Sequence, residues 1–206
     1  MIDRRSLLMS AAALAFGATP RDAGAAEPEA AKAFVNSLAN DAIQLMSSKN
    51  LPTRERTQKF RELFKRGFDI EVIGRFVLGR YWRDATEAEQ VEYLRLFEDL
   101  TVATYAGRFS EYSGETLTVL DGRPEDDRFL VVASQINRSG GNPPIRIDWR
   151  IADAQGRNKI VDVVVEGVSM SVTQRSEFAS VIQRNGGKIQ GLIVALRDKT
   201  KSLQTR

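Results

Sequence analysis

The sequence predicts an α+β fold in which N-terminal helices, an antiparallel, curved β-sheet meander and C-terminal helices follow one another. Apolar residues recur at helical spacing as far as about Tyr105, alternate like strand residues as far as Val165, and return to helical spacing after Thr173. Consecutive strands joined by short turns favour an antiparallel sheet with helices over one face. A curved sheet covered in this way can enclose an apolar hollow.

The first residues have the three parts of an export signal. Residues 4–5 are arginines, Leu7 to Phe16 is apolar, and Ala23-Gly24-Ala25 supplies small residues before a cleavage point. We therefore expect residues 1–26 to be a signal peptide and residues 27–206 to be a single domain in a bacterial periplasm. Paired arginines occur in both Sec and twin-arginine signals, so the export route stays open.

The composition argues against several kinds of chemistry. The 206-residue chain has no histidine and no cysteine, on which triads, zinc sites, redox pairs and lipid anchors most often depend. Its net charge of +3 is too small to indicate nucleic-acid binding. No apolar stretch after the signal reaches the roughly 18 residues of a membrane-spanning helix. These features favour a carrier without cofactors over a catalyst.

Three helices are predicted in the first part of the domain. Apolar residues recur at helical spacing from Glu29 to Ser48. Thr53 is expected to cap a second helix, and Asp69 a third that Gly79 closes.

A fourth, longer helix is predicted from a capping box. Thr86-Glu87-Ala88-Glu89 has the spacing at which a threonine and a glutamate satisfy each other's backbone N–H groups. The helical spacing continues through Tyr93 and Tyr105 and stops before Gly114.

The spacing of apolar residues then changes from about 3.6 to 2. Two strands, one around Leu117 and one from Phe129 to Ala133, are expected to be joined by a turn at Asp121-Gly122-Arg123-Pro124.

The third strand alternates most cleanly. One face carries Ile145, Ile147, Trp149 and Ile151, and the other carries Arg146, Asp148 and Arg150. This alternation predicts one buried face and one wet face.

The chain ends with one more strand and two helices. Ile160 to Val165 is nearly continuous in aliphatic residues, and Gly167 to Val172 is expected to extend the sheet. Helices are predicted at Thr173–Gln183 and Lys188–Asp198.

Two arrangements of residues raise the alternative of a hydrolase. Gly167 to Ser171 falls one residue short of a nucleophile elbow, but the chain has no histidine to act as base. Asp148 and Asp162 lie on strands expected to be neighbours, as the carboxylates of a glycosidase would. Nearby arginines such as Arg150 could neutralise them, so a solvated ion-pair network is the favoured interpretation.

Two sequence blocks resemble a known family. The first is Leu78 to Thr86 (LGRYWRDAT), preceded by Phe68-Asp69. The second is Glu166 to Phe178 (EGVSMSVTQRSEF), preceded by Val161-Asp162-Val163-Val164. In this order and at this separation, the blocks resemble the MlaC and toluene-tolerance family of periplasmic lipid carriers. Asn158 departs from the family, which often has a tryptophan there.

The resemblance implies a non-enzymatic lipid carrier that interacts with complexes in two membranes. It would carry a phospholipid between an outer-membrane lipoprotein complex and an inner-membrane ABC transporter complex, and so help to maintain outer-membrane lipid asymmetry. Hopanoid-associated proteins share the pattern, so another lipid stays an alternative. No metal or cofactor is implied.

The resemblance also gives apolar residues a role beyond core packing, because the acyl chains would lie between helices and sheet. From the N-terminal helices we expect Phe76, Tyr81, Trp82, Phe97, Leu100 and Tyr105 to contact lipid; Phe109 belongs to the same aromatic group, part of which packs and part of which lines the acyl tunnel. From the sheet and the C-terminal helices we expect Ile147, Trp149, Val163, Val165, Val168, Phe178, Ile182 and Leu192 to do so. Asp162, Glu166 and Arg175 are expected to form part of a partner surface.

Overall fold

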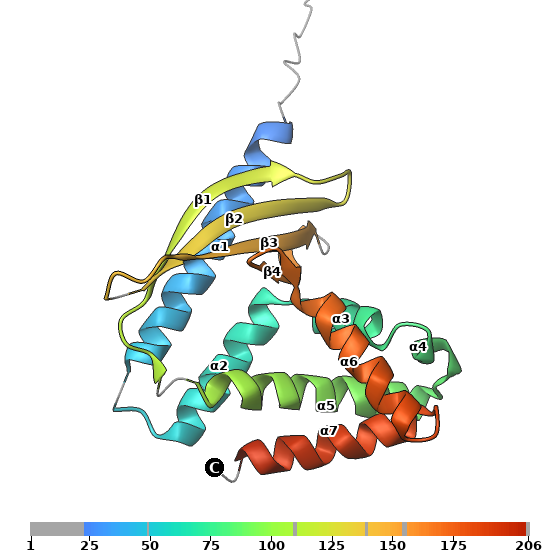
Figure 1. Cartoon of the computed structure of the whole chain (residues 1–206). Helices are drawn as coiled ribbons and strands as arrows, with labels where there is room; N and C mark the ends of the chain where they lie inside the picture. Colours follow the sequence, from blue (N-terminus) through green and yellow to red (C-terminus); the bar gives the residue numbers. More distant parts are fainter. Residues whose placement is uncertain (1–22, 49, 109–110, 139, 154–155, 205–206) are drawn as a thin grey trace, which may run out of the picture.

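The computed structural model describes residues 23–48, 50–108, 111–138, 140–153 and 156–204 (Figure 1). The N-terminal helices are α1 (Ala23–Ser47), α2 (Thr53–Gly67), α3 (Ile70–Leu78), α4 (Tyr81–Asp84) and α5 (Glu87–Ala106). The strands are β1 (Thr116–Pro124), β2 (Phe129–Asn137), β3 (Ile145–Asp153), β4 (Asn158–Val165) and β5 (Val168–Ser169), and they precede α6 (Met170–Arg184) and α7 (Ile189–Gln204). This order confirms the predicted α+β class. The expected signal peptide falls largely outside the described residues, as does Phe109.

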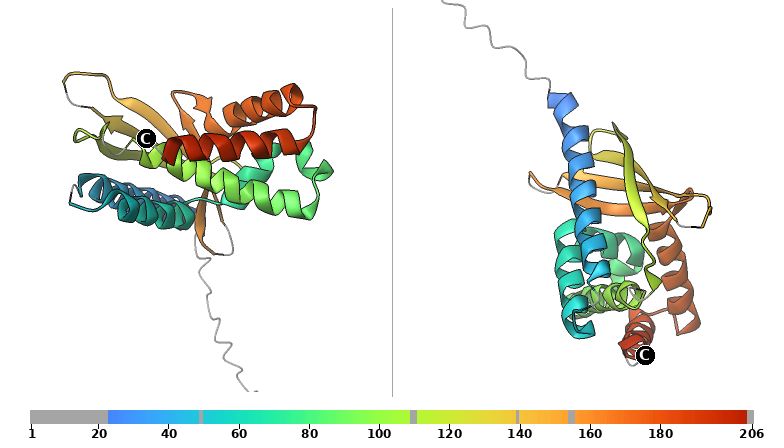
Figure 2. Two further views of the ribbon diagram at one scale, coloured as in Figure 1. Left: turned by 90° about the horizontal axis from the view of Figure 1, so that it is seen from below. Right: turned by 90° about the vertical axis from the view of Figure 1, so that its left-hand side faces the viewer.

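The strands form one antiparallel sheet in the order β1-β2-β3-β4-β5, as the meander prediction required. Helix α1 lies across one face of this sheet (Figure 1; Figure 2, right). The expectation that the helices as a group cover a face is wrong. Helices α2, α3 and α6 contact the sheet at β4, and α5 and α7 lie farther from it, side by side. The helices after α1 therefore join the sheet at β4, near the β4–β5 side of the sheet.

This arrangement divides the core into two clusters. The sheet cluster joins α1 to β2, β3 and β4 through Ala31, Val35, Val132, Ile151 and Ile160. The helix cluster joins α3, α4, α5, α6 and α7 through residues such as Val77, Tyr93, Ile182 and Leu192. Phe68, between α2 and α3, packs against both.

The helix ends follow local sequence signals, with one exception. The Asp69 carboxylate accepts a hydrogen bond from the Val72 N–H at 3.0 Å, and Gly79 ends α3 with a positive φ of 60°. The capping box of Thr86 and Glu89 is complete. The prediction that Thr53 caps α2 is wrong: Pro52 occupies that position, and no side chain caps the helix there.

The predicted turn at Asp121 to Pro124 is also wrong, because these residues belong to β1. The register of β1 against β2 shifts between Val119 and Asp121, and pairing then continues to Pro124. Gly122 serves a close approach: a Cβ there would lie 2.9 Å from Cγ of Lys32 and 3.0 Å from the carbonyl oxygen of Pro28, both on α1.

The third strand has the predicted faces, whereas the last part of the sheet is shorter than expected. Ile147 and Ile151 are buried, and Arg146 is exposed. Strand β5 ends at Ser169, because the Ser169 hydroxyl accepts a hydrogen bond from the Val172 N–H at 3.1 Å and caps α6. Among the described residues, no helix is long and apolar enough to cross a membrane.

Candidate functional site

The predicted lipid-contact residues of the helices converge on the helix cluster. Tyr81, Phe97, Phe178, Ile182 and Leu192 are all buried in it. Trp82 and Leu100 are half-buried and pack against the same cluster. Sequence spacing therefore identified residues that lie together, although in the structure they contact one another as core residues do.

Tyr93 is the centre of this cluster, and the sequence analysis did not include it among the site residues. Its side chain is fully buried and its hydroxyl donates to the Gly74 carbonyl at 2.9 Å. Its ring meets Phe178 and Trp82 edge to face, with centroids 6.3 and 6.5 Å apart. Burial raises the pKa of the Tyr93 phenol well above its usual range. Tyr93 thus fixes α5 against α3 as a neutral hydrogen-bond donor.

The predicted contact residues of the sheet share one face of β3 and β4. Trp149 pairs with Val163, and Ile147, two residues earlier on β3, pairs with Val165. The Trp149 indole donates to the Ser134 hydroxyl at 2.8 Å, and that hydroxyl donates to the Ile147 carbonyl at 3.1 Å. These bonds hold the indole in one orientation on the inner face.

A third group of apolar residues lies in neither cluster. Leu45 of α1, Phe64 of α2, Val102 of α5 and Ile147 of β3 are each less than 9% exposed, yet they belong to neither the helix cluster nor the sheet cluster. We call this group the seam. Among its members the sequence analysis selected only Ile147, because helical spacing shows that Leu45, Phe64 and Val102 face inward but not what they face.

Three predicted contact residues lie at the surface instead of in the interior. Phe76 is 44% exposed, Tyr105 is 48% exposed and Val168 is 53% exposed. Phe76 and Tyr105 lie on helices whose other faces are buried, and Val168 lies on the two-residue strand β5. Their contact with lipid stays a prediction.

The three predicted partner-surface residues have different surroundings. The half-buried Asp162 carboxylate accepts hydrogen bonds from the Ser169 hydroxyl at 2.5 Å and from the Ser171 N–H at 3.1 Å, so it fastens the start of α6 to β4. Glu166 has a positive φ of 50° in the β4–β5 turn and accepts from the Arg146 N–H. Arg175 is exposed on α6. Asp162 and Glu166 therefore make hydrogen bonds within the fold, whereas the Arg175 guanidinium lies over the Phe76 ring.

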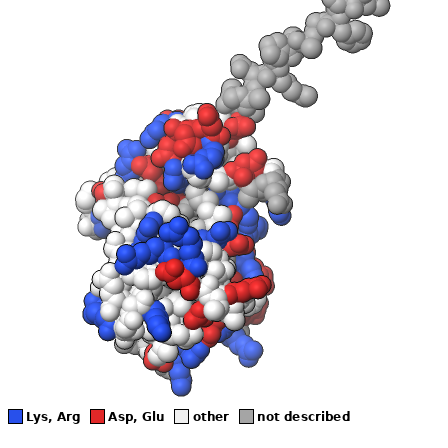
Figure 3. Space-filling model, turned by 90° about the vertical axis from the view of Figure 1, so that its right-hand side faces the viewer, with Lys and Arg blue, Asp and Glu red and all other residues white. Residues whose placement is uncertain are grey.

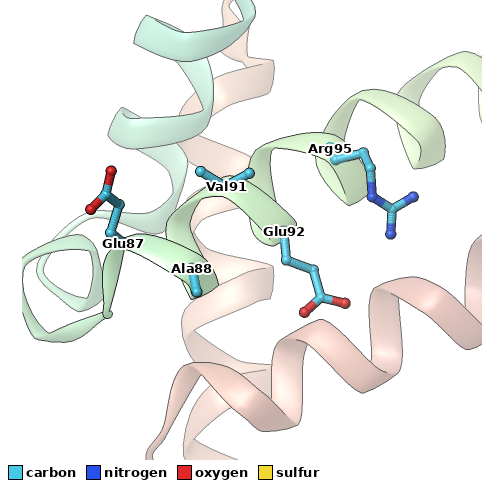
Figure 4. Close-up of a pocket in the computed structure, with 5 residues that line it drawn as sticks. All are labelled: Glu87, Ala88, Val91, Glu92 and Arg95. Atoms are coloured by element: carbon cyan, nitrogen blue, oxygen red, sulfur yellow. The ribbon is translucent and has the colours of Figure 1, made fainter.

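Two surface hollows are defined by described residues, and neither includes a predicted lipid-contact residue. The first runs along α5 and is lined by Glu87, Ala88, Val91, Glu92 and Arg95 (Figure 4). Glu92 points toward α7, where it accepts a hydrogen bond from Arg197. All five lining residues belong to α5, and they combine three charged side chains with Ala88 and Val91.

The second hollow lies where α2 and α3 meet the ends of β3 and β4. Its lining combines apolar side chains with side chains of both charges; the lining residues are Lys65, Phe68, Asp69, Ile70, Val72, Arg128, Phe129, Ala152, Asp153, Arg157, Lys159 and Val161. The Lys159 ammonium donates to the carbonyls of Lys65 and Arg66 at 2.7 and 2.8 Å, so it closes the end of α2. Burial lowers the pKa of Lys159.

Comparison with known proteins gives relatives of one kind. The chain is 24% identical over 121 residues to the intermembrane phospholipid transport system binding protein MlaC of Haemophilus influenzae, a match covering 57% of this chain and 56% of the relative. It is 23% identical over 114 residues to the toluene tolerance protein ttg2D of Pseudomonas putida, covering 55% and 53%. The chain thus spans about half the length of the curated relatives it matches.

A solved structure supports the same fold. The phospholipid-binding protein of Ralstonia solanacearum, solved in complex with a phospholipid, matches with a TM-score of 0.75 and 24% identity, covering 84% of this chain and 98% of that one. The family model described as MlaC protein matches residues 36–198, most of the length that the structure describes. The chain therefore belongs to the MlaC family.

Proposed function

We propose that this protein binds a phospholipid and carries it through the periplasm. The observation that carries the proposal is the seam, where buried apolar side chains from α1, α2, α5 and β3 belong to neither packed cluster. The phospholipid complex of the similarly folded Ralstonia protein supports it. In this chain, acyl chains would lie along the seam and against Val165.

The division of the core explains how lipid could enter without unfolding the protein. The sheet cluster and the helix cluster each hold their own elements together, and Phe68 packs against both. Separating the two layers at the seam would leave both clusters intact. Glycines with positive φ lie at the end of α3 (Gly79), between α5 and β1 (Gly114) and between α6 and α7 (Gly187), and they would serve as joints.

The energetics favour a carrier that both loads and unloads. Two acyl chains contain roughly 30 methylenes, whose removal from water is worth about 24 kcal/mol at ~0.8 kcal/mol each. A bilayer offers nearly the same apolar transfer, so exchange between bilayer and protein would be close to balanced. Head groups would stay near water, and selectivity for them would be modest.

The carboxylates considered for hydrolysis have other contacts. Asp148 forms an ion pair with Arg146 at 3.2 Å, and Asp162 holds the start of α6. Each carboxylate therefore has a structural reason for its position. We propose that the protein has no catalytic step, and its cargo would leave unchanged.

The direct test is extraction of lipid from protein purified from a periplasmic extract without detergent. We expect a phospholipid at near-stoichiometric amount by mass spectrometry; a hopanoid would redirect the proposal to that lipid. Folded protein that contains no lipid, and takes up none from vesicles, would refute it.

A pair of variants on one strand sharpens this test. Val165 lies on the inner face of β4, and its neighbour Val164 lies on the outer face, opposite Asp148. Val165→Trp should lower the lipid content severalfold at an unchanged circular dichroism spectrum, whereas Val164→Trp should leave it unchanged. Equal lipid in both variants would contradict the seam as the binding site.

The partners follow from the same proposal. An outer-membrane lipoprotein complex would supply or receive the lipid, and an inner-membrane ABC transporter complex would do the reverse. Fractionation of tagged protein should place it in the periplasm, and cross-linking in intact cells should capture a protein from each membrane. Retention in the cytoplasm would contradict this assignment.

A further inference from the structure

One corner of the molecule combines arginines with aromatic rings. The residues of this arginine–aromatic corner are Arg75, Phe76, Arg80, Tyr81, Trp82 and Arg175, from α3, the α3–α4 connection, α4 and α6. The guanidinium of Arg175 lies 5.2 Å from the ring centre of Phe76, that of Arg75 lies 5.2 Å from Trp82, and that of Arg80 lies 4.9 Å from Tyr81. Three cation–π contacts on neighbouring short elements are a dense local group.

Exposed aliphatic side chains lie beside this corner. The Asp69 N–H donates to the Ile160 carbonyl, and the Ser171 N–H donates to Asp162, so α3 and α6 both start at β4. The contact of Arg175 with Phe76 fixes their register, so the preceding turns of the two helices lie next to each other. Those turns carry Val72 and Val172, which are 48% and 52% exposed, and Val168 just before α6 is 53% exposed.

Charge at the corner is mostly positive. Arg83 adds a fourth exposed arginine, and the nearby carboxylates are Glu71, which lies 3.9 Å from Arg75, and Asp84 at the end of α4. Lys and Arg side chains gather in the middle of the face seen in Figure 3, next to uncharged surface and to a smaller group of Asp and Glu side chains. The corner therefore presents exposed apolar side chains next to several arginines.

We propose that the arginine–aromatic corner docks on an anionic phospholipid bilayer. Valine and phenylalanine side chains would enter the boundary between head groups and acyl chains, and the long arginine side chains would reach the phosphates. Phe76 and Val172 are exposed apolar side chains close to the exposed Arg175, an arrangement that suits the broad surface of a bilayer.

The inference goes beyond the proposed function, because a protein can hold a lipid without ever touching a bilayer. Docking would bring the carrier to the source of its cargo. It also gives Phe76 and Val168 a contact with lipid from outside the fold, and Arg175 a role at a partner surface.

The test is sedimentation of the periplasmically purified protein with phosphatidylglycerol vesicles and with phosphatidylcholine vesicles. We expect binding to the anionic vesicles, weakened by salt, and little binding to the neutral ones. Equal binding to both kinds of vesicle, or none to phosphatidylglycerol, would overturn the proposal. The lipid content of the purified protein is measured separately. A protein that contains lipid but does not bind vesicles would refute only the docking proposal, and a protein that binds vesicles but contains no lipid would refute only the carrier function.

Matched variants locate the surface. Arg175→Gln should weaken binding to phosphatidylglycerol about fivefold, as expected for one arginine near an anionic membrane. Arg54→Gln, an exposed arginine on α2, should leave it unchanged. Val172→Ser should weaken binding severalfold, whereas Val91→Ser, at a 64% exposed position on α5, should not. Equal effects within either pair would overturn the assignment of the corner, provided that circular dichroism shows all four variants folded.

Discussion

Removal of one hydroxyl from the helix cluster tests the packing that the structure assigns to Tyr93. In Tyr93→Phe the ring contacts with Phe178 and Trp82 are kept, and only the bond to the Gly74 carbonyl is lost. A typical buried hydrogen bond contributes about 1 kcal/mol, so the free energy of unfolding should fall by about that amount. For a domain of this size the melting temperature should fall by about 2–4 °C.

The matched control is the same substitution at an exposed position. Tyr105 is 48% exposed on the same helix, so Tyr105→Phe should change the free energy of unfolding by less than about 0.5 kcal/mol. Urea unfolding followed by circular dichroism measures both. If the two variants lose the same stability, the buried bond of Tyr93 does not contribute as its geometry indicates.

Alkaline pH provides a second measurement on the same variant. Burial raises the pKa of Tyr93 in the folded state, while in the unfolded state it stays near its ordinary value of about 10. The unfolded chain therefore releases this proton first as pH rises, and the stability that Tyr93 gives below pH about 10 is lost above it. Because Tyr93→Phe lacks this group, the stability difference between wild type and variant should shrink above pH about 10. A difference that stays constant to higher pH would refute the reasoning.

Three further substitutions test the structural contacts. Thr86→Ala should lose about 1 kcal/mol in urea unfolding by breaking the capping box, while Thr53→Ala, which removes no side-chain cap, should lose less than half of that. Asp162→Ala should cost about 2–3 kcal/mol because it leaves the start of α6 without its carboxylate, and Asp148→Ala less than about 1 kcal/mol; equal losses would contradict this. Gly122→Ala should lower the melting temperature because its methyl group meets α1; an unchanged value would show that α1 can move aside.

Local signals predicted those features whose cause is local. Asp69 and the pair of Thr86 and Glu89 cap helices because their side chains reach backbone N–H groups within three residues. The alternation around Trp149 predicted a strand with one inner face because successive side chains point to opposite sides. Neither feature depends on the rest of the fold.

The same kind of signal failed where a distant element decides the outcome. Gly122 and Pro124 have the composition of a turn, but pairing with β2 and the approach of α1 keep them in a strand. Phe76 and Tyr105 have helical spacing and apolar character, but both are exposed, and the Phe76 ring lies against the Arg175 guanidinium of α6 and is not part of the helix cluster.

The sequence by itself determined the α+β class, most helix ends, the order of the strands and, by resemblance, the family. Only the tertiary structure decided that the core is divided into two clusters, that Leu45, Phe64, Val102 and Ile147 are buried without belonging to either cluster, and that arginines and rings converge at one corner. The reason is physical: periodicity states which side of an element is apolar, whereas the partner of that side is chosen by packing between segments far apart in the chain.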